Sequence, residues 1–245
     1  MIAIVLAAVT VGSTTLGGYL ALRSKDRFHL VLGLAAGLLL GLVGFDLIPT
    51  IFAGTSVMVS SKVSLVAVAF VAGFLILHFT EQLAGSHEPA DSDYDHEHTH
   101  FGDFAGAIGA TAMAGHVFMD GVAIAVSYKV SHSLGIAVFL ALLVHAFSDG
   151  LNTVAMLVKH GHWTSRGKLF LIIDAVARIG GAALGSYLTV SDRWVNVYLG
   201  LFAGFVIYIA TSHILPEAHS RHPSKVTMLT TLAGVGIMWI IVAIL

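Results

Sequence analysis

Apolar residues follow one another along this chain in eight long stretches, separated by connections that are mostly short and polar. A helix needs roughly 20 apolar residues to cross about 30 Å of hydrocarbon, and each stretch has about this length. The pattern therefore predicts an all-α integral membrane protein with a single transmembrane domain, residues 1–245, and no soluble domain. The predicted spans are residues 2–22, 30–52, 63–80, 104–128, 133–158, 168–190, 194–216 and 225–245.

Composition agrees with a chain that lies in lipid. Charged residues make up 11% of the sequence, against about 25% in soluble domains. The net charge of −2 offers no basic field, so we expect a lipid bilayer as the partner and no nucleic acid. The chain has no cysteine, which excludes disulfides and thiolate metal sites. Small residues spaced four apart predict close helix contacts at Gly37/Gly41, Gly181/Gly185 and Gly200/Gly204.

Basic residues distinguish the two sides of the membrane. Eight Lys and Arg residues fall in the odd-numbered connections and three in the even-numbered ones. Because basic residues stay on the cytoplasmic side, this asymmetry predicts that both termini lie outside. The compact connections indicate a plasma membrane, as in a prokaryotic inner membrane. The eight residues are Arg23, Lys25, Arg27, Lys159, Arg166, Lys168, Arg221 and Lys225.

The one long connection, residues 81–103, intersperses histidines with acidic residues. It holds too little apolar surface to fold by itself, so we expect a disordered cytoplasmic loop. Imidazoles among carboxylates favour weak binding of divalent cations, which would buffer or sense metal. The alternative is a solvated acidic linker. The histidines are His87, His96, His98 and His100.

One six-residue pattern, H-x-F-x-D-G, occurs in both the fourth and the fifth predicted span. The first copy holds His116 and Asp120, and the second holds His145 and Asp149. Four residues separate His from Asp in each copy, so the two side chains share one helix face. Both histidines lie about a dozen residues into their spans, near half depth. The connecting loop is short, so the helices are antiparallel and the motifs form an inverted pair around the midplane.

These four side chains form a candidate metal site. An ionisable residue at mid-membrane costs at least about 2.5–3.5 kcal/mol, which makes it a functional candidate. Two imidazoles and two carboxylates suit Zn²⁺, and also Fe²⁺, Mn²⁺, Co²⁺ and Cd²⁺. The alternative is structural: each Asp hydrogen-bonds a His only to hold two helices together.

Other polar residues in the predicted spans are candidates for a cation pathway. Asp46 lies near an outer end, whereas Asp174, His213 and Glu217 lie near cytoplasmic ends. Asn152 shares a helix face with His145 and is either a partner that orients a ligand or a helix–helix hydrogen bond.

Arg178 is the one basic residue deep within a predicted span. Its guanidinium can snorkel, pair with Asp174 one turn earlier, or pair with Asp120 or Asp149 across the bundle. Each of the two pairings would tune the charge of the site.

These features resemble the ZIP family of divalent-metal transporters over nearly the whole chain. The resemblance rests on eight spans, a histidine-bearing loop after the third and the twin motifs of the fourth and fifth. AAGLLLGLVGFDLIP in the second span and LFAGFVIYIATSHILPEA in the seventh also resemble family segments. The resemblance implies a ZIP-like bundle with an inverted repeat, transport and not an enzyme activity, and a homodimer.

The chain departs from the family pattern beside its motifs. Val117 and Ala146 stand where members with a two-metal centre have further ligands, and neither side chain can bind metal. Arg178 aligns with an acid of that centre, so the resemblance implies a guanidinium in place of a second cation. Ser148 replaces the family's helix-bending proline. Together these departures imply a single-metal site.

We therefore expect the protein to carry a divalent transition metal, foremost Zn²⁺, into the cytoplasm, without a resident cofactor. One alternative is an intramembrane metal-dependent hydrolase, which would need an open coordination position and a general base. Another is an exporter of the diffusion-facilitator type, which usually has six spans and a soluble domain.

Overall fold

All eight predicted stretches form helices in the computed structural model, which describes residues 1–21, 28–54, 57–83, 101–159, 165–189, 191–220 and 225–245. Within these ranges there is no β-strand, and a single isolated bridge joins Met58 and Ser64 in the connection before α4 (Leu65–Leu83). Helix ends differ from the predicted ones by a few residues. The predicted loop 81–103 is shorter than expected at both ends, since helices continue to Leu83 and start again at Phe101.

Two of the helices are interrupted, so ten α-helices and two π turns are distinguished in the described part of the chain. The single-segment helices are α1 (Ile2–Ala21), α4 (Leu65–Leu83), α5 (Phe101–Val130), α6 (His132–Lys159), α7 (Ser165–Tyr187) and α10 (Lys225–Ile244). The interrupted ones are α2 (Phe28–Leu42), η1 (Val43–Leu47) and α3 (Ile48–Ala53), then α8 (Asp192–Tyr208), η2 (Ile209–Ile214) and α9 (Leu215–Ser220).

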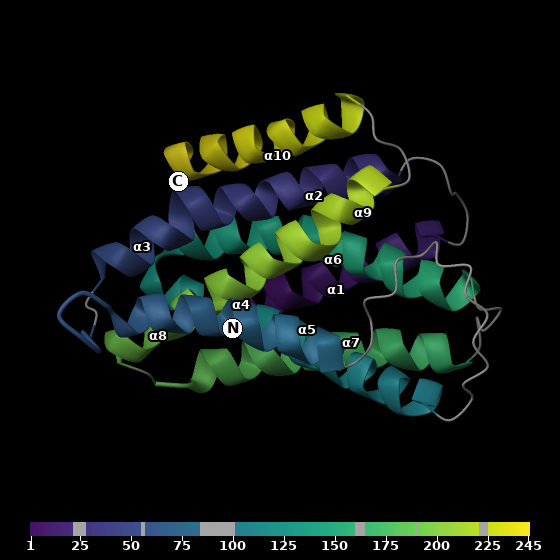
Figure 1. The fold of residues 1–245 in the computed structure, drawn as a ribbon, viewed down its shortest axis with the longest axis horizontal. Helices are drawn as coiled ribbons and strands as arrows, with labels where there is room; N and C mark the ends of the chain where they lie inside the picture. The colour runs from purple at the N-terminus through teal and green to yellow at the C-terminus, as the bar shows by residue number, and fades with distance from the viewer. Residues whose placement is uncertain (22–27, 55–56, 84–100, 160–164, 190, 221–224) are drawn as a thin grey trace.

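The long helices associate as four pairs: α1 with α6, α2 with α10, α4 with α8, and α5 with α7. Members of a pair run in the same direction. Along α2, for example, Gly33 faces Thr227 and Gly41 faces Met238, so the contacts advance together along both helices. Figure 1 shows α10 lying along α2 at one edge of the molecule, with α7 near the opposite edge.

The pairs combine into two groups. The first group contains α1, α5, α6 and α7, and the second contains α2, α4, α8 and α10 with their short continuations. The contact of α2 with α6 is the most extensive between the groups. Both motif-bearing helices belong to the first group, so the candidate metal ligands sit within one body.

Glycines set the distance between paired helices. A Cβ added at Gly37, Gly181 or Gly204 would overlap a backbone carbonyl oxygen of the partner helix. The remaining members of the three predicted small-residue pairs, Gly41, Gly185 and Gly200, also face the partner closely. The predicted close approach is thus confirmed, and it depends on the absent side chain.

The two interrupted helices share a cause, which is a proline shortly after the π turn. Pro49 follows η1 and Pro216 follows η2. Proline lacks a backbone N–H, and its ring crowds the carbonyl four residues earlier. In both helices the chain widens to a bond spanning five residues, from the N–H of Ile48 to the carbonyl of Val43 and from Leu215 to Ala210.

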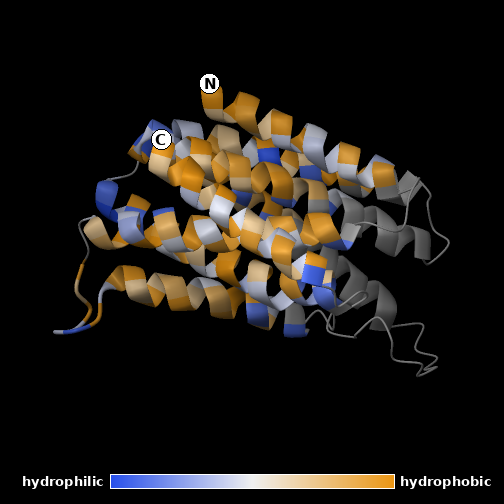
Figure 2. Ribbon diagram, turned by 90° about the horizontal axis from the view of Figure 1, so that it is seen from above, coloured by the Kyte–Doolittle hydropathy of each residue, from blue (hydrophilic) through white to orange (hydrophobic). Residues whose placement is uncertain are grey.

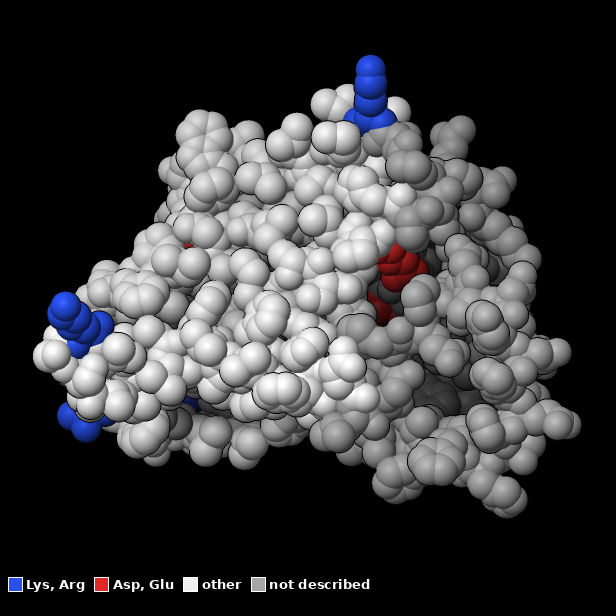
Figure 3. Space-filling model, viewed as in Figure 1, with Lys and Arg blue, Asp and Glu red and all other residues white. Residues whose placement is uncertain are grey.

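The outer surface has the character expected of a lipid-facing bundle. In the described part of the chain, four helical stretches are long and apolar enough to cross a membrane, and two further apolar helices are shorter. Large apolar side chains such as Val71, Ile172 and Trp239 are exposed on the outside. Apolar residues dominate the ribbon in Figure 2, and Lys and Arg lie at the margins of the face in Figure 3. The described residues thus form an all-helical membrane-type bundle.

Candidate metal centre

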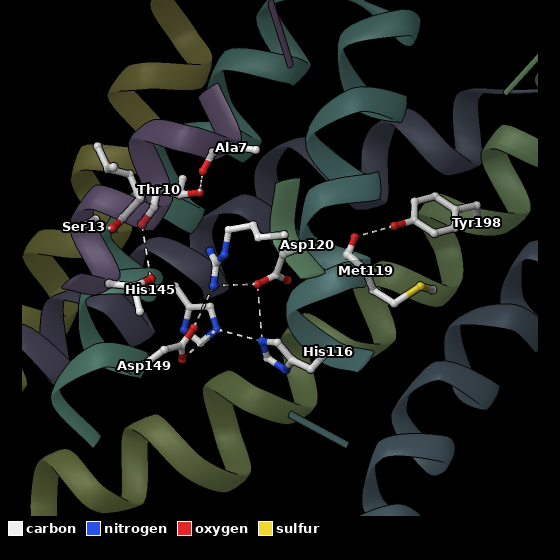
Figure 4. A network of polar contacts seen from close by, with 12 residues as sticks. Ala7, Thr10, Ser13, His116, Met119, Asp120, His145, Asp149 and Tyr198 are labelled. Atoms are coloured by element: carbon white, nitrogen blue, oxygen red, sulfur yellow. Dashed lines mark hydrogen bonds and ion pairs between the residues drawn. The ribbon is translucent and has the colours of Figure 1, made fainter. Parts of the chain in front are cut away.

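The two H-x-F-x-D-G motifs meet inside the bundle. α5 carries His116 and Asp120, α6 carries His145 and Asp149, and the two helices are in contact. One ligand atom from each side chain can be chosen so that all four lie within 4.8 Å of one another. Figure 4 shows the four side chains converging on one region between their helices. The structure therefore brings together the four side chains that the motifs single out.

The separations between ligand atoms match those of a tetrahedral site. Bonds of about 2.0–2.1 Å to Zn²⁺ place neighbouring ligand atoms about 3.3–3.4 Å apart. Nε2 of His116 lies 3.2 Å from Nε2 of His145. The His116–Asp120 and His145–Asp149 contacts, from Nε2 to a carboxylate oxygen, are both 3.4 Å. Three edges of a metal-sized tetrahedron are thus already in place.

The facing imidazoles indicate which nitrogens would bind. The Nε2 atoms point at each other, so without an ion one ring donates an N–H to the other. A metal ion requires both lone pairs, which puts each ring proton on Nδ1. Nδ1 of His145 is buried, and among the described residues it has no hydrogen-bond partner. The donor set of two imidazoles and two carboxylates fits a divalent transition metal.

Arg178 of α7 lies against the two carboxylates. Its side chain is fully buried, and Nη2 lies 3.3 Å from Oδ2 of Asp149 and 3.7 Å from Oδ2 of Asp120. Of the pairings left open by the sequence, the structure therefore has those with Asp149 and Asp120, and snorkelling to the surface is excluded. Two carboxylates and one guanidinium leave a formal charge of −2 + 1 = −1 when both imidazoles are neutral.

The final glycine of each motif holds the site against a neighbouring helix. A Cβ at Gly121 would overlap the carbonyl oxygen of Arg178 on α7. A Cβ at Gly150 would overlap the carbonyl oxygen of Thr14 on α1. No role for these two glycines follows from the sequence alone, although the repeated glycine of the H-x-F-x-D-G motif is the available signal. They let α7 and α1 approach the ligand-bearing turns.

Tyr198 also lies beside the site, and no motif in the sequence indicates it. Its hydroxyl donates to the carbonyl of Met119, at 2.7 Å, directly beside Asp120 (Figure 4). Tyr198 lies on α8 and Met119 on α5, so this bond joins the two helix groups. A tyrosine in an apolar span has no sequence signature for such a partner.

A cavity of about 400 Å³ reaches the metal site from between the two groups. Its walls come from α4, α5 and the end of α8, and it borders both His116 and Asp120. Most of its lining is apolar, including Leu77, Phe118 and Phe202. The site is therefore open to the cavity on the side formed by His116 and Asp120 of α5.

The other predicted polar residues are spread over the bundle. Asp46 is in η1, where it hydrogen-bonds Thr50, and His213 is in η2 with its ring 5.7 Å from that of Tyr208. The half-buried Glu217 is in α9. None of the three joins the four-ligand cluster of the described residues.

The remaining predictions differ in what the structure describes. Asp174 is in α7, one turn before Arg178. Asn152 is in α6, but its side chain is outside the described part. The loop residues His87, His96, His98 and His100 also lie outside the described residues.

A buried His/Asp cluster that could hold a metal ion, enclosed by apolar helices, is the arrangement of a membrane protein with an internal cation site. A family model, the ZIP zinc transporter, matches residues 85–242. The chain belongs to this family.

Curated relatives agree with the family model. The chain is 30% identical to the metal cation symporter ZIP8 of Rattus norvegicus over 113 residues, which is 46% of this chain and 24% of the relative. It is 24% identical to the zinc transporter YKE4 of Saccharomyces cerevisiae over 234 residues, or 83% of this chain and 66% of the relative. Zinc transporter SLC39A7 of Rattus norvegicus matches at 28% over 151 residues, with 56% and 32% covered. The matched part thus spans from about a quarter to two thirds of these relatives.

Proposed function

We propose that this protein carries a divalent transition metal, foremost Zn²⁺, across the membrane through a single site made by His116, Asp120, His145 and Asp149. The observation that carries the proposal is the convergence of four metal-ligating atoms within 4.8 Å in the interior of an apolar bundle. Two carboxylates offset the charge of a divalent ion, which lowers the cost of placing it in a low-dielectric interior. Family membership and the names of the relatives, zinc transporters and a metal cation symporter, support the same cargo.

The proposed topology has eight spans with both termini outside, in a plasma membrane. The parallel pairing of helices supports it, because α1/α6, α2/α10, α4/α8 and α5/α7 each join two spans of the same parity. Spans of equal parity must run in the same direction through a membrane. The acidic connection between α4 and α5 is then cytoplasmic, where its histidines would bind metal weakly. The protein is also proposed to form a homodimer.

Transport is proposed to follow the boundary between the two helix groups. The cavity at this boundary reaches His116 and Asp120, which would give the ion access from one side at a time. A shift of one group against the other would expose the site to the opposite side. Asp46 near one end and His213 and Glu217 near the other are proposed contacts along the way. The proposed direction of flux is into the cytoplasm, and an exporter would reverse it.

An intramembrane hydrolase is less well supported. A catalytic zinc keeps one position open for water. Here four side chains converge, which would complete a tetrahedral sphere, and family membership favours transport.

Uptake of Zn²⁺ into proteoliposomes that enclose a zinc-sensitive dye tests the proposal. We expect Asp120→Ala and His145→Ala to lose uptake and to bind Zn²⁺ at least about tenfold more weakly, because each removes a ligand. Matched controls are Asp192→Ala and His132→Ala, which remove exposed residues of the same types at helix ends. Both controls should retain uptake.

Uptake by the two site variants at the rate of their controls would reject the midplane site. Binding of Zn²⁺ by the unaltered protein without any flux would reject transport and leave a sensor or an enzyme. Flux only from inside to outside, in liposomes of defined orientation, would reject the proposed direction.

A further inference from the structure

Two buried polar groups on α7 have unused hydrogen-bonding capacity beside the metal centre. Among the described residues, Nε and Nη1 of Arg178 have no hydrogen-bond partner, and neither does Oδ2 of Asp174. Asp174 is four residues before Arg178, so the two side chains lie on one face, one turn apart. A helical side chain leans toward the N-terminus of its helix, which directs Arg178 toward Asp174.

Arg178 currently uses one nitrogen to hold the carboxylates that a metal ion would need. Nη2 contacts Oδ2 of Asp149 and Oδ2 of Asp120, while His116 lies 3.4 Å from the same oxygen of Asp120. A divalent ion on these carboxylates would place two cations side by side in a buried site. The mutual repulsion is large at low dielectric, and Arg178 keeps its charge.

We propose that Arg178 exchanges partners during metal binding, leaving Asp120 and Asp149 for Asp174 when the ion arrives. The guanidinium holds the two carboxylates while no ion is present, and Asp174 receives it afterwards. Arg178 and Asp174 are then positioning residues that set the affinity of the site, without touching the ion. This inference rests on the proposed metal site and adds to it a device that compensates charge in both states.

A double-mutant cycle on the full-length chain tests the exchange. Zn²⁺ affinity is measured by calorimetry in detergent for the unaltered protein, Asp174→Asn, Arg178→Gln and the double variant. We expect Arg178→Gln to bind Zn²⁺ about tenfold more tightly, because the competing cation is gone. We expect Asp174→Asn to weaken binding about tenfold when Arg178 is present, because the guanidinium loses its second partner.

The discriminating result is the effect of Asp174→Asn in the Arg178→Gln background. Partner exchange predicts that Asp174→Asn lowers Zn²⁺ affinity less in the Arg178→Gln background, since no guanidinium needs a new partner. If Asp174 acts only by its own charge, the loss is at least as large in that background, because a nearby positive charge has been removed. An equal or larger loss, or no effect of Asp174→Asn in the unaltered protein, overturns the proposal.

A second measurement covers the case in which Arg178→Gln does not fold. The chain has six arginines, so their guanidinium Nε–H signals can be followed by NMR with ¹⁵N-labelled arginine. Zn²⁺ should shift and protect from exchange the Arg178 signal, assigned by its absence in Arg178→Lys. Asp174→Asn should abolish that protection at saturating Zn²⁺. Equal protection in both proteins overturns the exchange, whereas failure of the unaltered protein to bind Zn²⁺ rejects the proposed function itself.

Discussion

At the level of single residues, the metal centre depends on donor type and on spacing of one helical turn. His116 and Asp120 on α5 mirror His145 and Asp149 on α6, and the resulting contacts of 3.2–3.4 Å suit a small tetrahedral ion. Imidazole favours Zn²⁺, whereas carboxylate oxygens suit Mn²⁺ and other harder ions. Metal preference should therefore follow the number of imidazoles.

Replacement of one imidazole tests this dependence. We expect His116→Asp to weaken Zn²⁺ binding at least about tenfold while changing Mn²⁺ binding much less, because an oxygen replaces a nitrogen ligand. Competition between the two ions, measured on purified protein, gives the ratio of affinities. His132→Asp, an exposed histidine at the start of α6, is the control. An unchanged Zn²⁺ to Mn²⁺ ratio in His116→Asp would remove this side chain from the ligand set.

At the level of helices, glycines and prolines decide how the ligand-bearing segments are held. Gly121 and Gly150 follow the two aspartates directly and let α7 and α1 approach within backbone contact. The π turns η1 and η2, each before a proline, interrupt α2 and α8 in the opposite group. Both features act through backbone geometry, so a single added methyl group at such a glycine should lower the stability of the protein.

Two glycines on the same helix provide a matched test. A Cβ at Gly121 would overlap the carbonyl of Arg178, whereas a Cβ at Gly115 would have nothing within 4 Å. We expect Gly121→Ala to lower the free energy of unfolding by about 1–3 kcal/mol, because α5 and α7 must separate. Gly115→Ala should leave it unchanged or slightly raised, since alanine favours helix. Thermal unfolding in detergent compares them, and equal midpoints would contradict a close α5–α7 contact.

At the level of the whole molecule, two helix groups share one boundary, and the cavity lies on it. In the proposed transport cycle, the relative position of the two groups governs which side of the membrane reaches the site. The bond from Tyr198 to the carbonyl of Met119 crosses this boundary beside Asp120. This bond therefore gives the proposed movement of the groups a direct contact with the ligand-bearing turn of α5. The side from which the ion would enter depends on the direction in which the helices cross the membrane.

The absence of cysteine makes that direction simple to measure. Ile2, Met58 and Leu245 are all exposed, and each is replaced singly by cysteine. These three cysteines should react with an impermeant maleimide added outside intact cells. Lys225→Cys should react only after the membrane is opened, because the proposed orientation puts the basic connections inside. Labelling of Ile2→Cys and Leu245→Cys from opposite sides would rule out an even number of spans.

Much of this arrangement could be predicted from the chain. The apolar stretches predicted the helices, since each is long enough to require burial or lipid on every face. The repeated motif predicted that His116, Asp120, His145 and Asp149 would meet, because a spacing of four residues fixes one helix face. The small-residue pairs predicted close helix contacts, and Gly37, Gly181 and Gly204 confirm them.

Other features could not be predicted, because they depend on residues distant in the chain. The partners of Arg178 stayed open, since Asp174 is its neighbour along α7 while Asp149 is its neighbour across the bundle. The π turns could not be predicted, because one added residue in a helical turn leaves the pattern of apolar residues almost unchanged. The hydrogen bond of Tyr198 could not be predicted, because its hydroxyl and the carbonyl of Met119 come together only when α8 packs against α5.

The sequence by itself determined the helices, the types of the metal ligands and the face on which each pair lies, because these follow from local composition and a period of 3.6 residues. Only the tertiary structure decided which helices pair and where the cavity reaches the site. It also decided that Arg178 turns to Asp149 and Asp120. These features depend on contacts between whole helices. How closely two backbones approach at the glycines also determines which buried charges lie near one another.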